Sequence, residues 1–231
     1  EEGTLAHEFG ELYLRKDGVC DITDDEFNSR LEELMSDDSF NEEMLDVVPL
    51  YSDYCIAQLN EARTQNPLAI MEVEQKLDLT EYIPESFGTG DCIIVNDETL
   101  EIIDLKYGKG VPVYATYNKQ LMLYALGALR KYDTMYDIET VILTVCQPRI
   151  NNISSFRMPV TELIEWAETE LKPKAKLAFE GKGELAVGDW CRFCAVKNRC
   201  RAMYEEQMQI AKYEFADAEL LQDDEIADIL K

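Results

Sequence analysis

Apolar residues recur at helical spacing through the first quarter of the chain, where they predict three helices. The first helix spans residues 3–16 and carries its apolar face on Leu5, Phe9, Leu12 and Tyr13. Two acid-rich amphipathic helices follow at residues 24–36 and 41–65. Pro67 ends this stretch, since the residue before a proline disfavours helix. We therefore assign residues 1–66 to a helical N-terminal part.

After Pro67 the pattern changes to alternating and β-branched positions, which are typical of strands. Residues 69–79 predict a strand with Glu72, Glu74, Lys76 and Asp78 on one solvated face. Two apolar runs around the turn at residues 96–99 predict a β-hairpin. Further helices are expected at residues 113–131 and 161–180, and further strands at residues 140–146 and 153–158, the last at a sheet edge. Residues 67–180 thus predict an α/β core with a mixed sheet of about four or five strands flanked by helices.

The hairpin carries the first candidate chemistry. Asp91 is expected to begin its first strand, while Asp104 and Lys106 end the second. Residues two apart on a strand share a face, so Asp104 and Lys106 project together. Two carboxylates and an ammonium group suit a divalent cation and an oriented water. For an isolated Asp-x-Lys pattern, an ordinary surface ion pair is the commoner explanation.

Several motifs in the same order strengthen the catalytic interpretation. Asp91 followed by Asp104-Leu105-Lys106 resembles the split motif of the PD-(D/E)xK nuclease superfamily, in its RecB-like branch. The helical Gln-x-x-x-Tyr of that branch is matched by Gln120 and Tyr124, and its upstream histidine by His7. The phrases GTGD, DLKYGKG, QLMLYALGAL and QPRI resemble a phage and prophage family within the superfamily. The resemblance implies a restriction-endonuclease-like core.

The resemblance also implies roles for individual residues. It assigns Mg²⁺ or Mn²⁺ ligation to His7, Asp91, Asp104 and the backbone carbonyl of Leu105. Lys106 is expected to position the attacking water, and Gln120 and Tyr124 to lie near it and complete the catalytic set. Glu74 is a further acid on a neighbouring strand that the family often places near the metal, and we expect it to lie behind the ligands rather than to bind the cation itself.

Charge is the strongest argument against a nucleic-acid enzyme. The chain has 22 basic and 47 acidic residues, a formal net charge of −25, whereas a DNA-binding domain usually carries a basic surface. Salt screens distant charges, so local charge decides. Between Asp104 and Lys131 there are five basic residues and one acid, and Lys109, in a glycine-bracketed loop, and Lys119 are the expected DNA contacts. We expect an acidic body with a basic channel, and a basic protein or a phage recombination protein as a partner.

Three of the seven cysteines fall within ten residues, at Cys191, Cys194 and Cys200. Structural zinc normally needs two paired motifs, which are absent. The spacing resembles the RecB-like branch, where three late cysteines and one early cysteine hold a [4Fe-4S] cluster. The early cysteine is expected upstream of Glu1, with Cys20 or Cys55 as alternatives. These cysteines define a third part, residues 181–231, whose acidic tail begins at Ala211.

The expected function is a metal-dependent DNA nuclease, with exonuclease action favoured, serving phage recombination or DNA processing. No run of 18 apolar residues predicts a membrane helix, so a cytoplasmic protein of a phage- or prophage-bearing bacterium is expected. The chain starts without methionine and is interpreted as part of a longer protein. Two alternatives stay open: a catalytically silent DNA- or protein-binding module of a recombination or packaging assembly, and a structural iron-sulfur or zinc protein.

Overall fold

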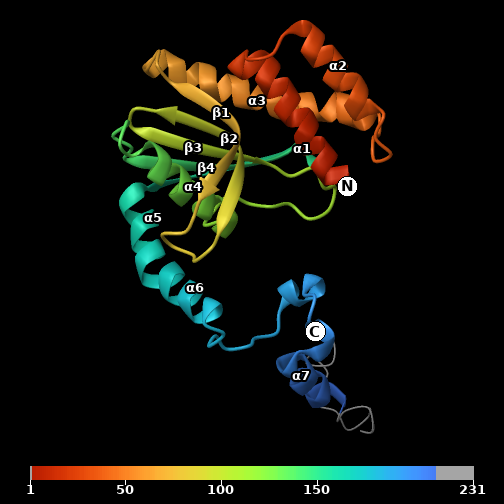
Figure 1. Cartoon of the computed structure of the whole chain (residues 1–231), viewed down its shortest axis with the longest axis vertical. Coiled ribbons are helices and arrows are strands. Elements are labelled where there is room, and N and C mark those ends of the chain that lie inside the picture. Colours follow the sequence, from red (N-terminus) through yellow and green to blue (C-terminus); the bar gives the residue numbers. More distant parts are fainter. Residues whose placement is uncertain (1, 212–231) are drawn as a thin grey trace. The chain divides into compact units, whose positions relative to one another are not determined.

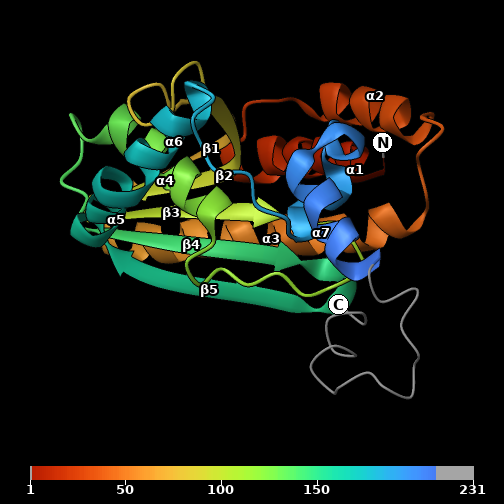
Figure 2. The same ribbon diagram turned by 90° about the horizontal axis from the view of Figure 1, so that it is seen from below.

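The computed structural model describes residues 2–211, which form two units. The first unit is Glu1–Phe179 and the second is Glu180–Lys231. Figures 1 and 2 show the chain from two sides. The predicted acidic tail beyond Ala211 lies outside the described residues.

Three helices precede the sheet, as predicted. They are α1 (Glu2–Tyr13), which continues as a π-helical segment (Leu14–Val19), α2 (Asp24–Met35) and α3 (Glu43–Gln65). A capping box starts α2: Thr23 accepts from the Glu26 backbone N–H, and the Glu26 side chain accepts from that of Thr23. The helices pack on one another through a core of Leu5, Phe9, Leu12, Leu34, Met44 and Val48.

The sheet has five strands in the order β1-β2-β3-β4-β5. The strands are β1 (Ile70–Asp78), β2 (Phe87–Asn96), β3 (Thr99–Leu105), β4 (Thr140–Gln147) and β5 (Asn152–Pro159). Strands β3 and β4 pair in parallel and the other neighbours are antiparallel, so the sheet is mixed. The hairpin pairs Cys92 with Ile103. The predicted α/β class, mixed sheet and flanking helices are confirmed.

Helices cover both faces of the sheet (Figure 1). Helix α3 packs on one face through Tyr51, Cys55 and Leu59, against strand residues such as Cys92 and Ile103. Helix α4 (Lys119–Tyr132) packs on the other face, through residues such as Leu121, Ala125 and Leu126. Figure 2 shows β5 at the sheet edge.

Several predicted boundaries were wrong. Helix α4 begins at Lys119 rather than Val113. The side chain of Asn118 caps it by accepting hydrogen bonds from the backbone N–H groups of Gln120 and Leu121. Strand β2 begins at Phe87 rather than at Asp91, because its pairing with β1 continues to Asp78. The helix expected at residues 161–180 is divided into α5 (Val160–Trp166), a π-helical segment (Ala167–Leu171) and α6 (Lys172–Phe179).

The second unit contains short elements in its described part. Two 3-10 turns (Asp189–Phe193 and Lys197–Arg199) precede α7 (Arg201–Ala211). None of the described residues 180–211 is buried. This part of the chain therefore lacks an apolar core of its own within the described range. Among residues 2–211, no helix has the length and apolar character needed to cross a membrane.

Candidate metal centre

The site forms where strands β2 and β3 separate. Their pairing ends at Cys92 and Ile103, and Asp91 is the next residue of β2. Its Oδ2 atom accepts a 2.8 Å hydrogen bond from the backbone N–H of Leu105. The carboxylate thus satisfies a strand N–H at the end of the ladder, which fixes its position. Asp91 is buried, with 8% of its surface exposed.

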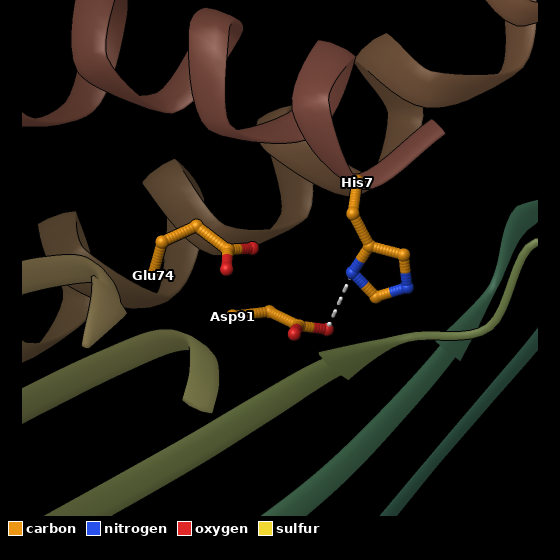
Figure 3. Close-up of side chains that lie close together, drawn as sticks. All are labelled: His7, Glu74 and Asp91. Carbon is orange, nitrogen blue, oxygen red and sulfur yellow. Dashed lines mark ion pairs between the residues drawn. The ribbon is translucent and has the colours of Figure 1, made fainter. Parts of the chain in front are cut away.

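His7 reaches the same place from helix α1 (Figure 3). Its Nδ1 atom lies 3.3 Å from Oδ2 of Asp91. Helix α1 lies close to α3 and β3 at Gly10, where an added Cβ would be 3.2 Å from the Tyr51 ring and 3.5 Å from Leu105. Close packing one turn after His7 therefore holds the imidazole over the strand end, and the predicted approach of His7 to Asp91 is found.

Glu74 completes the group through an unusual backbone conformation. It lies across from Asp91, between the pairs Val73–Cys92 and Gln75–Gly90, and has φ +50°. Positive φ is uncommon for a residue with a side chain. The side chain points to the space shared with His7 and Asp91 (Figure 3), whereas Glu72 pairs with Lys131 of α4. The single solvated face expected from alternation is interrupted at Glu74, whose backbone breaks the alternation. The position near the other ligands that the resemblance implies for Glu74 is found.

His7, Glu74 and Asp91 each offer a ligand atom, and these atoms lie within 4.8 Å of one another. Within residues 2–211 this is the one group of at least three histidine, cysteine or acidic side chains that meets so closely. Two carboxylates and an imidazole suit Mn²⁺ or Mg²⁺. Asp104, a predicted ligand, is outside this group, and its assignment as a ligand stays a prediction.

Asp104 instead forms an ion pair with Lys106 beside the group. The Lys106 Nζ atom lies 2.8 Å from Oδ2 of Asp104 and donates a 3.1 Å hydrogen bond to Oδ1. Among the described residues, the buried Oδ2 atom has no hydrogen-bond partner, so the Lys106 ammonium at 2.8 Å is the charge that compensates it. The donor set of His7, Glu74 and Asp91 beside this pair fits a divalent cation.

A polar chain holds Lys106 from the other side. Its Nζ atom donates a 3.0 Å hydrogen bond to Oε1 of Gln120, and Nε2 of Gln120 donates a 2.8 Å hydrogen bond to the Tyr124 hydroxyl. Gln120 and Tyr124 lie one turn apart on α4. The predicted proximity of Gln120 and Tyr124 to Lys106 is found.

Gly88 allows this chain to approach the sheet, a role that sequence analysis missed. A Cβ at Gly88 would lie 2.7 Å from the Tyr124 ring, so this position of β2 cannot carry a side chain without displacing Tyr124. The glycines of the Gly88-Thr-Gly90-Asp91 phrase were the signal that could have indicated it. The same subsequence thus seats Tyr124 and supplies Asp91.

Burial and mutual repulsion raise the pKa values of the acids. The pKa of Glu74 rises to about 7, first through burial and then through the charge of Asp91. The pKa of Asp104 rises to about 6 for the same two reasons, against the opposing effect of Lys106. Burial lowers the pKa of His7, but its hydrogen bond to Asp91 and the charges of the three acids raise it overall. Burial and the neighbouring carboxylate therefore favour the protonated forms of Glu74 and Asp104, and a bound cation would favour their ionised forms.

A hollow of about 390 Å³ adjoins the site. Its lining includes His7 and Lys106 of the site, Gly108 and Gly110 of the glycine-bracketed loop, and Gln147 of β4. The predicted DNA contacts are engaged within the protein: Lys109 lies 2.8 Å from a Glu43 oxygen, and the Lys119 ammonium lies 4.5 Å from the centre of the Trp166 ring. Their role in DNA binding stays a prediction.

The cysteines of the second unit are free thiols and are partly exposed at Cys191, Cys194 and Cys200. They do not form a close group of three or more potential ligands in the described part of the chain. Cys55 is buried in the core beside Cys92, and Cys20 is exposed. The iron-sulfur cluster therefore stays a prediction.

The fold and site define an α/β protein with a candidate divalent-cation centre at the end of its central hairpin. The chain belongs to the family described as "Protein of unknown function (DUF2800)", whose model matches residues 1–231. One solved structure that it resembles distantly is entitled "Crystal structure of SSO0001", with 16% identity over 77% of this chain and 80% of that chain and a TM-score of 0.31.

Proposed function

We propose that this protein is a metal-dependent deoxyribonuclease that hydrolyses phosphodiester bonds. The observation that carries the proposal is the convergence of His7, Glu74 and Asp91 next to the buried Asp104–Lys106 pair. An acidic N,O donor set beside a lysine is the arrangement that metal-assisted phosphodiester hydrolysis needs. The ordered motifs that resemble the PD-(D/E)xK superfamily support the same reaction class.

One set of residues would bind the cation, and Lys106 acts on the attacking water and the phosphoryl group. A bound Mg²⁺ or Mn²⁺ would polarise the phosphoryl group and lower the pKa of a water molecule. His7, Glu74 and Asp91 would hold the cation, and Asp104, which is paired with Lys106, and the Leu105 carbonyl are further predicted ligands. Lys106 orients the attacking water through Nζ and stabilises developing negative charge on the phosphoryl oxygens.

Gln120 and Tyr124 keep Lys106 in place. Gln120 accepts from Lys106 and donates to Tyr124, so its amide orientation is fixed at both ends. Gln120 is a neutral acceptor and does not neutralise the ammonium group of Lys106. Among the described residues, Asp104 is the one carboxylate that competes with the substrate for this group. The proposal includes exonuclease action on DNA during phage recombination or DNA processing, which the resemblance supports.

A nuclease assay tests the proposal. Wild-type protein with Mn²⁺ is expected to degrade linear duplex or single-stranded DNA, and EDTA is expected to stop it. The double variant Asp104→Ala/Lys106→Ala is expected to be inactive, while Lys174→Ala, which alters an exposed lysine paired only with Glu170, retains activity. Activity that survives the double substitution contradicts the assignment.

A second candidate is a catalytically silent DNA- or protein-binding module. The net charge of −25 favours it, as does the engagement of Lys109 by Glu43. Calorimetry with Mn²⁺ separates the two functions. An absence of Mn²⁺ binding in the wild type, together with DNA or partner binding that persists in Asp91→Ala, favours the silent module.

A further inference from the structure

Lys109, in the glycine-bracketed loop beside the hollow, is held by a carboxylate of helix α3. The Lys109 Nζ atom lies 2.8 Å from Oε2 of Glu43, the first residue of α3. Nη2 of Arg149 donates a 2.7 Å hydrogen bond to the same oxygen. One carboxylate oxygen thus bridges an ammonium and a guanidinium, which is the environment that a phosphate oxygen takes in a basic site.

Arg149 is the fixed member of this arrangement. Only 8% of its side chain is exposed, and its guanidinium lies 4.3 Å from the centre of the Tyr107 ring. It also contacts Glu2 and the Tyr107 carbonyl, at 3.2 and 3.4 Å. Its buried Nε atom has no hydrogen-bond partner among the residues that the structure describes. Such a cation stays in place when one partner leaves.

Lys109 is the movable member. Its side chain is 57% exposed, and an added Cβ at either flanking glycine, Gly108 or Gly110, would meet no atom within 4 Å. Exposed ion pairs of this kind are weak, with a typical strength below about 1 kcal/mol. A competing anion can therefore take Lys109 from Glu43 at small cost, and the open loop permits the movement.

We propose that Glu43 occupies the position of a substrate phosphate, and that a DNA phosphate displaces its carboxylate from Lys109 when DNA enters the hollow. The inference rests on the proposed function, because it takes the hollow lined by His7, Lys106, Gly108 and Gly110 as the substrate path. Glu43 then weakens DNA binding and restricts it to anions that compete for Lys109.

DNA-binding affinity measured by fluorescence anisotropy tests this proposal, with a labelled 20-base-pair duplex and Ca²⁺ in place of Mn²⁺. Glu43→Gln is expected to tighten binding about twofold to fivefold, the equivalent of one surface ion pair. The matched control is Glu2→Gln, which removes the same charge from Arg149 without touching Lys109. It is expected to change the affinity less than twofold.

The double variant tests whether Lys109 is the cation that the DNA phosphate takes from Glu43. Adding Lys109→Ala to Glu43→Gln is expected to abolish the gain and to lower the slope of log K against log salt concentration by about 0.9, the value for one phosphate contact. Equal gains in Glu43→Gln and Glu2→Gln, or a gain that survives Lys109→Ala, overturn the proposal. If Glu43→Gln does not fold, Lys109→Ala alone decides, since an unchanged affinity overturns it.

The outcomes separate this inference from the nuclease proposal. Wild-type protein that binds the duplex but never cleaves it with Mn²⁺ contradicts the nuclease, while the affinities of the variants still decide the role of Glu43. Wild-type protein that cleaves DNA while both glutamine variants behave alike contradicts the role of Glu43 only. An absence of duplex binding overturns the role of Glu43, while the cleavage assay, which includes single-stranded DNA, still decides the nuclease proposal.

Discussion

Two regions carry residues that sequence alone suggested as metal ligands, and they are built in opposite ways. The group of His7, Glu74 and Asp91 is held by a helix, a strained strand position and the end of a hairpin, all of which pack on buried cores. The cysteines of the second unit lie in a described segment without a buried residue. Packing therefore positions the first group before any cation binds, whereas no buried core positions the cysteines in the described part of the second unit.

The largest expected effect separates the two regions by metal affinity. Asp91→Asn removes one carboxylate charge from the centre while an oxygen can still accept from Leu105, so Mn²⁺ affinity is expected to fall about 100-fold. Cys191→Ser, in the other unit, is expected to leave that affinity unchanged. Isothermal titration calorimetry at pH 8 measures both variants. Equal losses in the two variants would contradict the contrast.

A second prediction concerns the order that a ligand brings to the cysteine region. Limited proteolysis of purified protein is expected to cut first within residues 180–211, because this range lacks a core. If the cysteines bind a cluster, anaerobic reconstitution with iron and sulfide is expected to slow this cleavage about tenfold and add absorbance near 400 nm.

The matched control is the triple variant Cys191→Ser/Cys194→Ser/Cys200→Ser. It is expected to show neither the absorbance nor the protection after the same treatment. Protection that appears equally in the triple variant would show that these cysteines do not bind the cluster.

A third prediction tests the packing that seats Lys106. Gly88→Ala places a Cβ against the Tyr124 ring, so the Gln120 contact to Lys106 shifts and kcat is expected to fall about tenfold, with a stability loss of about 1–3 kcal/mol. Gly108→Ala adds the same methyl group in open space and is expected to change thermal stability less. Melting curves and steady-state rates measure both, and identical behaviour of the two variants would show that Tyr124 does not depend on Gly88.

The smallest expected effect is the pH dependence of stability without metal. Burial raises the pKa of Glu74 from 4.5 to about 7, so the folded protein retains a proton that the unfolded chain releases. The free energy of unfolding should therefore fall as the pH rises from about 5 to 8. Tm should fall by about 2–4 °C for each kcal/mol of unfolding free energy that is lost. Glu74→Gln is expected to reduce this fall.

Glu101 supplies the control, because it is buried on β3 and accepts a 2.8 Å hydrogen bond from Thr144. Burial raises its pKa to about 7 as well, so Glu101→Gln should also reduce the fall. Of these two acids, Mn²⁺ competes with the proton at Glu74 alone, and saturating Mn²⁺ should therefore remove the contribution of Glu74 and leave that of Glu101. Mn²⁺ that alters both contributions equally would place the cation elsewhere.

The same contrast explains which features could be predicted from sequence. The hairpin, the N-terminal helices and the approach of His7 to Asp91 follow from local periodicity, turn residues and a resemblance with ordered motifs. The polar chain from Lys106 to Tyr124 follows from helical spacing, because positions 120 and 124 share a face.

Other features depend on contacts that periodicity does not encode. Alternation predicts a solvated Glu74, and the resemblance alone suggested a place near the metal; the positive φ that turns the side chain toward His7 is not encoded in the pattern. The ion pairs that join Glu43 to Lys109 and Arg149 link residues 66 to 106 positions apart. A side chain at Asn118 decides where α4 begins, although the apolar pattern continues before it.

The most direct test of the central claim is an anomalous difference map from crystals soaked in Mn²⁺. The account predicts one strong manganese peak within about 2.5 Å of a His7 nitrogen and of carboxylate oxygens from Glu74 and Asp91. A map with manganese bound elsewhere, or with none at this place at saturating concentration, would contradict the claim that these three residues share one cation.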